Sequence, residues 1–396
     1  MNQSPRGVRL VIAIMGRRNA GKSSLVNAII GEEISIVSDT PGTTTDPVAK
    51  HYELLPVGPV TFYDTAGLDD TGALGLLRVD ASRKILWRAD IVVLVIDEQG
   101  LTEIEKSLVD ETKRLEIPCL IVFNKLDIKA PDESDREYCR SKCVPFVDVS
   151  AKTNKGISDL RASLISVTPL EVKREPTVVS DLISEGDIVV CVVPIDLAAP
   201  KGRLILPQVQ TLREILDCDA VGIVVKEREL EHCLSNLKQQ PSLVITDSQV
   251  ILKVAADVSE NIKLTTFSIL FARYKGDLTQ LVMGAEKIDA LRDGDKILMG
   301  EACSHHIQSD DIGRVKIPRW IRQYTGKDLI FDIYSGHDFP DDLEQYRLVV
   351  HCGACMLNRT EMIRRINECK RRGVAITNYG IAISKVQGIL HRVLAP

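Results

Sequence analysis

The sequence lacks three features that would each assign it to a large class of proteins. No apolar run approaches the roughly 18 to 20 residues that a transmembrane helix needs, and residues 1–6 lack the apolar core of a signal peptide. A basic surplus is also lacking, since 50 Lys and Arg are set against 55 Asp and Glu, which gives a net charge of −5. We therefore expect a cytoplasmic protein with no membrane partner and no nucleic-acid partner.

Cysteine, in contrast, is plentiful, with ten residues in a chain of 396. Because we expect no export, these cysteines should be reduced thiols or metal ligands rather than disulfides. The length predicts two or three domains, each large enough to bury its own core.

A phosphate-binding loop is the most specific motif near the N-terminus. Residues 16–23 have the pattern G-x-x-x-x-G-K-S, between an expected strand at residues 8–15 and an expected helix at residues 23–30. The backbone N–H groups of such a loop surround phosphate oxygens, and the helix start adds partial positive charge. Lys22 is the expected catalytic contact to the β- and γ-phosphates, and Ser23 the expected Mg²⁺ ligand. The other expected contacts to the nucleotide are Gly16, Asn19, Ala20, Gly21 and Ser24.

Around this loop, apolar strands alternate with amphipathic helices, which predicts an α/β domain with a mostly parallel sheet at residues 7–172. The expected strands are residues 8–15, 60–64, 91–97, 118–124 and 144–150, and the expected helices are residues 23–30, 76–87, 103–115 and 157–164. In such a sheet the ligand binds beyond the carboxyl ends of the strands.

Polar residues that follow three of these strands complete the nucleotide site. Asp64 can hold Mg²⁺ through water, and the N–H of Gly67 can meet the γ-phosphate, so we expect both to be catalytic. Asp127, in the segment Asn124-Lys125-Leu126-Asp127, can accept two hydrogen bonds from guanine, which adenine cannot offer. The segment Ser150-Ala151-Lys152 can support the base near its O6. The expected ligands are therefore GTP and GDP.

In this order, the motifs make residues 8–170 resemble a translation-factor-class GTPase of the Era and TrmE (MnmE) type. The polar residues 41–46 can close over Mg²⁺, and the resemblance implies that Thr44 is the catalytic switch threonine and a Mg²⁺ ligand. It also implies that Asn19 could help to coordinate K⁺. Leu68 stands where Ras-like enzymes have a water-positioning glutamine, so we expect slow hydrolysis that depends on a partner, on K⁺ or on dimerisation.

A second α/β alternation is expected at residues 178–268, after a charged linker at residues 171–176 that ends in proline. The expected strands are residues 187–193, 220–225, 242–246 and 263–267, and the expected helices are residues 209–216, 229–238 and 248–255. This domain has no phosphate loop, and its cysteines lack the spacing of metal ligands. A small sheet with free edges favours a dimerisation surface, so we expect a homodimer.

The C-terminal domain, expected at residues 269–396, contains a candidate metal centre. Cys303 follows an expected strand at residues 296–299, and Cys352 and Cys355 lie between an expected strand at residues 347–350 and an expected helix at residues 358–371. Thiolates near a helix N-terminus are stabilised by its dipole. From spacing alone, a Cys₃His zinc site and a [4Fe–4S] cluster fit equally well. Residues 378–380, after an expected strand at residues 374–377, form either a plain turn or a contact at the same sheet end.

The combination of domains resembles the HydF family of [FeFe]-hydrogenase maturation GTPases, most specifically in Cys303-Ser304-His305 followed by His351-Cys352-Gly353-Ala354-Cys355. The resemblance implies that Cys303, Cys352 and Cys355 bind a [4Fe–4S] cluster, with His305 or His351 near the fourth iron. It also implies a scaffold and carrier that holds a two-iron precursor as cargo. The implied partners are apo-[FeFe]-hydrogenase and the radical SAM maturases HydE and HydG.

Two other functions are also compatible with parts of the sequence. An RNA- or ribosome-associated GTPase with a structural zinc site would need a basic face or a KH-like Gly-x-x-Gly loop. The acidic balance and the absence of that loop from residues 269–396 count against it. A redox-sensing GTPase would need only Cys352 and Cys355, which leaves Cys303 and its neighbouring histidines unexplained.

Overall fold

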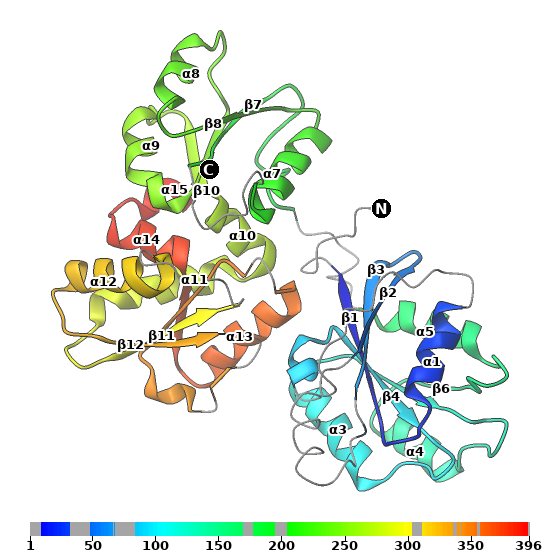
Figure 1. Cartoon of the computed structure of the whole chain (residues 1–396). Helices are drawn as coiled ribbons and strands as arrows, with labels where there is room; N and C mark the ends of the chain where they lie inside the picture. Colours follow the sequence, from blue (N-terminus) through cyan, green and yellow to red (C-terminus); the bar gives the residue numbers. More distant parts are fainter. Residues whose placement is uncertain are drawn as a thin grey trace. The chain divides into compact units, whose positions relative to one another are not determined.

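The computed structural model describes residues 9–31, 48–65, 67, 84–168, 177–194, 204–302, 311–335, 339–340, 342–354 and 357–394. The chain divides into an N-terminal unit, Met1–Glu175, and a C-terminal unit, Pro176–Pro396 (Figure 1). The division falls within the expected linker at residues 171–176. None of the helices in the described ranges combines the length and the apolar character that crossing a bilayer requires.

The N-terminal unit is built on a six-stranded sheet with the order β2-β3-β1-β4-β5-β6. Its strands pair in parallel except for β2, which is antiparallel to β3. The predicted mostly parallel sheet is therefore confirmed, and β2 is an addition that the sequence analysis missed. The strands are β1 (Leu10–Met15), β2 (Val48–Leu54), β3 (Gly58–Asp64), β4 (Ile91–Ile96), β5 (Cys119–Phe123) and β6 (Phe146–Asp148).

Helices cover both faces of this sheet because its central strands are apolar on both faces. The helices with stated bounds are α1 (Lys22–Ile30), α3 (Glu103–Arg114), α4 (Glu133–Ser141) and α5 (Ile157–Val167). Ile12 and Ile14 of β1 pack in the cluster that contains α1 and α5, whereas Ala13 and Met15 pack with α3 and α4. Most of the helix expected at residues 76–87 lies outside the described residues.

The C-terminal unit contains two four-stranded parallel sheets (Figure 1). The first has the order β10-β9-β7-β8, from β7 (Ile188–Val192), β8 (Val221–Val225), β9 (Leu243–Thr246) and β10 (Lys263–Thr266). Its flanking helices are α7 (Leu206–Asp217), α8 (Leu230–Asn236) and α9 (Ile251–Asp257), preceded by the 3₁₀ turn η2 (Ser248–Val250). Edge strand β8 exposes about half of Val221 and Val224, at 51% and 46%.

The second sheet has the order β12-β11-β13-β14 and is also parallel throughout. Its strands are β11 (Lys296–Glu301), β12 (Ile330–Ser335), β13 (Leu348–His351) and β14 (Ala375–Asn378). The helices of this region are α10 (Phe267–Lys275), α11 (Leu278–Glu286), α12 (Ile317–Thr325), α13 (Arg359–Arg371), α14 (Tyr379–Val386) and α15 (Leu390–Leu394). The short turns are η3 (Lys287–Ala290), η4 (Ile312–Lys316) and η5 (Leu343–Gln345).

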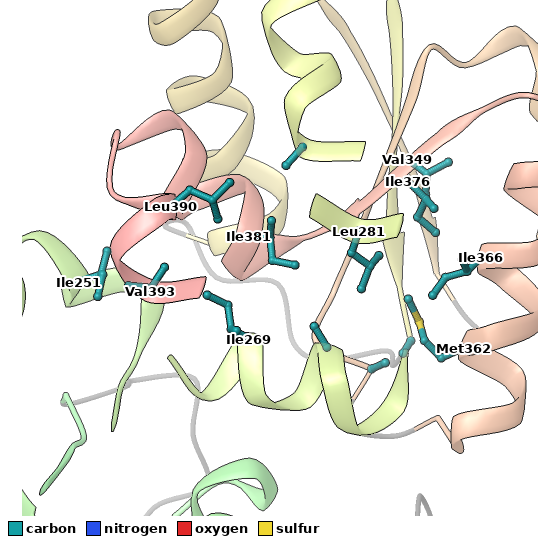
Figure 2. Packing of buried hydrophobic residues seen from close by; sticks show 14 of the residues in the cluster. Ile251, Ile269, Leu281, Val349, Met362, Ile366, Ile376, Ile381, Leu390 and Val393 are labelled. Atoms are coloured by element: carbon teal, nitrogen blue, oxygen red, sulfur yellow. The ribbon is translucent and has the colours of Figure 1, made fainter. Parts of the chain in front are cut away.

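The two sheets of the C-terminal unit share one hydrophobic core. Ile251, Ile269, Leu281, Val349 and Ile381, which come from five different elements, gather in one buried cluster (Figure 2). Helix α10 starts directly after β10, where the Thr266 side chain accepts a hydrogen bond from the Ile269 N–H at 3.2 Å. The boundary expected between residues 268 and 269 therefore lies inside α10.

Gly284 allows α11 to contact the backbone of β14. A Cβ at this position would lie 1.8 Å from the Ile376 carbonyl oxygen and 2.4 Å from its carbon. These atoms belong to strand backbone and cannot rotate away, so any side chain must push the helix off the sheet.

Replacing Gly284 by alanine should lower the free energy of unfolding of the C-terminal unit by about 3 kcal/mol, because the helix must move away from β14. Urea unfolding followed by circular dichroism measures this change. Met283→Ala is the control, because Met283 is the preceding residue of α11 and is 51% exposed. Equal stability of the two variants would show that the helix can shift without cost.

Candidate nucleotide site and cysteine site

The phosphate loop packs between the end of β4 and the segment Asn124-Lys125-Leu126-Asp127, which is expected to bind guanine. Gly16 has φ 147°, and a Cβ there would lie 2.4 Å from the Val95 carbonyl oxygen. Gly21 has φ 90°, and its Cβ would lie 2.3 Å from Nδ2 of Asn124. Both glycines are therefore required by positive φ and by close approach within the protein.

The side chain of Lys22 extends back along the phosphate loop to the backbone at its start. Its Nζ donates to the carbonyl oxygens of Gly16 at 2.9 Å and of Arg17 at 2.8 Å, and the residue is 8% exposed. The ammonium therefore lies at the loop that surrounds phosphate in proteins with this motif.

Ser23 and Asp64, the two expected Mg²⁺ ligands in the described part of the chain, are in contact. The Ser23 hydroxyl donates to Oδ2 of Asp64, so a hydroxyl and a carboxylate lie together at the ends of the loop and of β3. Oxygen donors of this kind suit Mg²⁺. Thr44, together with Leu68, lies outside the described residues, whereas Gly67 is described and buried.

Asn124 connects the phosphate loop with the two segments expected to contact the base, residues 124–127 and 150–152. Its Nδ2 donates to the Ala20 carbonyl oxygen at 2.9 Å, and its Oδ1 accepts from the Ala151 N–H at 3.0 Å. The Ser150 hydroxyl donates to Asp127, which lowers the pKa of that carboxyl below its usual value. Asp127 is thus an ionised acceptor, as guanine recognition requires. The structure brings the phosphate loop and both base segments together.

Two lysines also belong to these base segments. Lys125 pairs through Nζ with Oε2 of Glu98 at 2.7 Å, and this hydrogen bond lowers the pKa of Glu98. Lys152 is exposed, as are Ser24 and Asn19 of the phosphate loop. Asn19 has φ 61°, in the left-handed region.

Arg17 is a supporting residue of the loop that the motif did not reveal. The residue is 8% exposed, and its Nε donates to Oε1 of Glu105 at 2.7 Å. Its Nη2 donates to Oδ1 of Asp97 at 2.9 Å and to the Gly100 carbonyl oxygen at 2.8 Å. Glu105 is fully buried. The guanidinium therefore fixes the loop to the segment between β4 and α3, through contacts with residues about 80 positions away.

Replacing Arg17 by alanine should lower the free energy of unfolding of the N-terminal unit by about 3 kcal/mol, because the Glu105 carboxylate stays buried without its partner. GTP affinity should also fall, since the loop loses its support. Thermal unfolding and titration with a fluorescent GTP analogue measure both effects. In the control, Arg18→Ala at the next, exposed position, both quantities should change little, and matching losses in the two variants would contradict this role.

The cysteine site lies at the carboxyl edge of the second sheet of the C-terminal unit. The register aligns Tyr334, Gly300, His351 and Asn378 across its four strands. The next residue in each case is polar or carries sulfur: Ser335 and Glu301 end β12 and β11, Cys352 follows β13, and Tyr379 begins α14. The Cys352 Sγ accepts a hydrogen bond from the Ala302 N–H at 3.2 Å.

Only part of the expected metal centre falls within the described residues. Cys303, His305 and Cys355 lie outside them, and among the residues that the structure describes no three His, Cys, Asp or Glu side chains converge as a metal site. Gly300, which pairs with His351, precedes Cys303 by three residues. The chain therefore approaches Cys303 from the strand that neighbours Cys352.

His351 lies directly before Cys352 and is fully buried. Its Nδ1 lies 2.8 Å from the Cys352 carbonyl oxygen, and its Nε2 lies 2.7 Å from Nη1 of Arg365. Burial and the Arg365 charge lower the pKa of His351 to about 3. The neutral imidazole thus donates to the turn and accepts from the guanidinium, so both ring nitrogens have partners.

Lys275, at the end of α10, binds the same turn. It is 1% exposed, and its Nζ donates to the carbonyl oxygens of Ala354 at 3.1 Å and Leu357 at 2.8 Å. Ala354 has φ 53°, a left-handed conformation in the middle of the C-x-x-C segment. The Ala302 N–H donates to the Cys352 sulfur and the Lys275 ammonium holds the turn, an arrangement that suits a sulfur-ligated metal centre.

Replacing Lys275 by methionine should lower the free energy of unfolding of the C-terminal unit by about 3 kcal/mol, since two buried carbonyl groups lose a charged donor. Thermal unfolding measures the change. Lys253→Met is the matched control, because Lys253 is exposed on α9. If the two variants unfold at the same temperature, Lys275 does not hold the turn.

Known proteins resemble the chain in segments that follow one another. Models of three families match it: a 50S ribosome-binding GTPase at residues 11–125, a hydrogen maturase F dimerization domain at residues 178–276 and a hydrogen maturase F tetramerization domain at residues 279–396. The first of these matches agrees with the nucleotide site described above.

Curated relatives match about two fifths of the chain. GTPase Der of Nautilia profundicola is 40% identical over 183 residues, which are 42% of this chain and 38% of that protein. The tRNA modification GTPase MnmE of Nitrosomonas europaea is 36% identical over 169 residues, 41% of this chain and 35% of that protein. The chain thus spans little more than a third of the length of these relatives. A structure of Aquifex aeolicus Era with GDP and AlF₄⁻ is 22% identical and covers 55% of this chain and 93% of that chain, at a TM-score of 0.34.

The predicted family is confirmed by the order of its domains. A GTPase domain precedes two domains that are both characteristic of hydrogen maturase F, and together the three matches extend from residue 11 to residue 396. By this architecture, the chain belongs to the HydF family of hydrogenase maturases.

Proposed function

We propose that the chain is a GTPase and an iron–sulfur scaffold that carries the two-iron precursor to apo-[FeFe]-hydrogenase. The observation that carries this proposal is the pairing of Gly300 with His351 in a unit matched by the hydrogen maturase F domains. This pairing brings the segment before Cys303 beside Cys352, as a shared metal centre requires.

In the N-terminal unit, the proposed reaction is hydrolysis of GTP to GDP and phosphate. Lys22 and the loop N–H groups bind the phosphates, and Ser23 and Asp64 hold Mg²⁺ with Thr44. Gly67 binds the γ-phosphate, and Asp127 selects guanine. With Leu68 at the usual glutamine position, hydrolysis is slow until a partner, a dimer contact or K⁺ near Asn19 completes the site.

In the C-terminal unit, Cys303, Cys352 and Cys355 are the proposed ligands of a [4Fe–4S] cluster, which supplies an iron with an exchangeable position. Both ring nitrogens of His351 have hydrogen-bond partners. We therefore propose His305 or an exchangeable ligand, rather than His351, as the ligand of the fourth iron. A carrier needs such a position, because it must bind its cargo and later release it.

The proposed partners are HydE and HydG, which supply the cargo, and apo-hydrogenase, which receives it in the cytoplasm. A homodimer is proposed through residues 178–276, where edge strand β8 leaves Val221 and Val224 half exposed. An RNA- or ribosome-associated GTPase with zinc is the alternative function. The hydrogen maturase F domains make this alternative less favoured.

Two substitutions should separate the two activities, because the nucleotide and cysteine sites belong to different units. Lys22→Ala should lower GTP hydrolysis roughly 100-fold and leave the absorption and EPR spectra of the cluster unchanged. Cys352→Ser should leave GTP hydrolysis unchanged and alter the absorption and EPR spectra of the cluster. Anaerobic purification, metal and sulfide analysis, EPR and a phosphate-release assay provide the measurements, and each variant is the control for the other.

Hydrogenase activation should be impaired in both variants, because GTP is proposed to control partner docking rather than cluster chemistry. Loss of the cluster spectrum in Lys22→Ala would contradict the separation. Colourless, zinc-loaded wild-type protein from an oxygen-free preparation would contradict the iron–sulfur assignment and favour the alternative function.

A further inference from the structure

Tyr379 contributes a buried hydroxyl group with no hydrogen-bond partner to the row that contains Cys352. Its phenol oxygen is buried and has no partner in the structure as described. An unpaired buried hydroxyl costs about 1–3 kcal/mol relative to a paired one. Such a group at the edge of a proposed ligand site indicates that its acceptor arrives with the ligand.

The backbone register places Tyr379 beside Cys352. Asn378 pairs with His351, and each of the two residues of interest follows directly. Neighbouring strands lie about 4.8 Å apart, so the backbone of Cys352, directly after β13, lies beside that of Tyr379, the first residue of α14. Burial is the main cause of the raised pKa of Tyr379, and the charge of Cys352 is the next largest cause. The phenol therefore keeps its proton and can act as a donor beside this sulfur.

The neighbouring carboxylates are already engaged. Both oxygens of Glu301 accept from Arg314, at 3.0 and 2.6 Å, and Ser335 donates to Oε2 at 2.9 Å. Oδ1 of Asp311 accepts from the N–H groups of Gly313 and Arg314, both at 2.9 Å. The phenol is held against the start of η4, since a Cβ on Gly313 would lie 2.2 Å from its oxygen. The hydroxyl is thus fixed in position without a partner.

We propose that the Tyr379 hydroxyl donates a hydrogen bond to the iron–sulfur cluster, either to the Cys352 sulfur or to a sulfide next to it. The inference rests on the proposed function of the cysteine site. A hydrogen bond to sulfur stabilises the reduced, more negative cluster and raises its reduction potential. Tyr379 is therefore a positioning and tuning residue rather than an iron ligand.

The substitution Tyr379→Phe tests this role, because it removes the hydroxyl and keeps the ring that packs near Gly313. Thr377→Val is the matched control. Thr377 lies on β14, two residues before Tyr379, is fully buried, and its Oγ1 likewise has no hydrogen-bond partner in the structure as described. Both substitutions thus remove one buried, unpaired hydroxyl, but only one of these hydroxyls lies beside Cys352.

Full-length protein, purified without oxygen and reconstituted with iron and sulfide, is measured in three ways. We expect Tyr379→Phe to shift the midpoint potential of an EPR-monitored redox titration to a more negative value. Iron release to a chelator should become about fivefold faster, which corresponds to the loss of one hydrogen bond. Before reconstitution, however, the melting temperature of Tyr379→Phe should be unchanged or higher, because an unpaired polar group has been removed.

Thr377→Val should leave the potential and the rate of iron release at the wild-type values. The inference is overturned if Tyr379→Phe has the wild-type potential and release rate, or if both variants change alike. A phenolate-to-iron charge-transfer band in the wild type that Tyr379→Phe lacks would also overturn it, since the oxygen would then be a ligand. Wild-type protein that binds no iron would instead contradict the proposed function, so the two failures are distinguishable.

Discussion

Both candidate sites depend on the backbone register of parallel strands. Parallel strands end at the same edge of a sheet. The residues at or directly after the strand ends therefore lie side by side, even when they are far apart in sequence. In the C-terminal unit this register aligns Cys352 with Glu301 and Tyr379. In the N-terminal unit the pairing of Ile14 with Asp64 brings the end of β3 to the phosphate loop. Residues in the middle of the central strands instead form the core.

Behind each site, a buried cation binds backbone or carboxylate oxygens. Arg17 holds the phosphate loop to Asp97 and Glu105, and Lys275 holds the C-x-x-C turn through two carbonyl groups. Arg365 contacts His351 and Glu361 in the same way. Burying a charge is costly unless it is fully paired, so these pairs restrict the loops to few conformations. In the described part of each site, the backbone is thus held by buried charged groups.

The fold could be predicted wherever the pattern of apolar residues was strong. The fully buried strands β1, β4 and β5 were predicted within two residues at each end. Two of the missed elements have few buried residues: edge strand β12 has only intermediate or exposed residues, and α4 buries only Cys139 among its nine residues. Such elements are held by tertiary packing, which a local pattern does not contain.

The nucleotide site could be predicted because its motifs are local, and each follows one strand. The residues that support the phosphate loop could not be predicted, because Arg17 and Glu105 are 88 residues apart and no spacing rule connects them. Lys275 and Ala354 are separated by 79 residues in the same way. A charged residue on the apolar face of a helix, such as Arg365 beside Met362 and Ile366, was the available signal. It indicates that a buried partner exists but not which residue it is.

Helix α10 couples the two sheets of the C-terminal unit. Its N-terminus is capped by Thr266, the last residue of β10 in the first sheet, and its last residue, Lys275, binds the turn that contains Cys352. Ile269 and Ala272, between these ends, are buried in the core that the two sheets share. A shift of one sheet against the other would therefore have to break the bonds of Lys275 or open that core. Because both changes are costly, α10 holds the first sheet and the turn that contains Cys352 in a fixed arrangement.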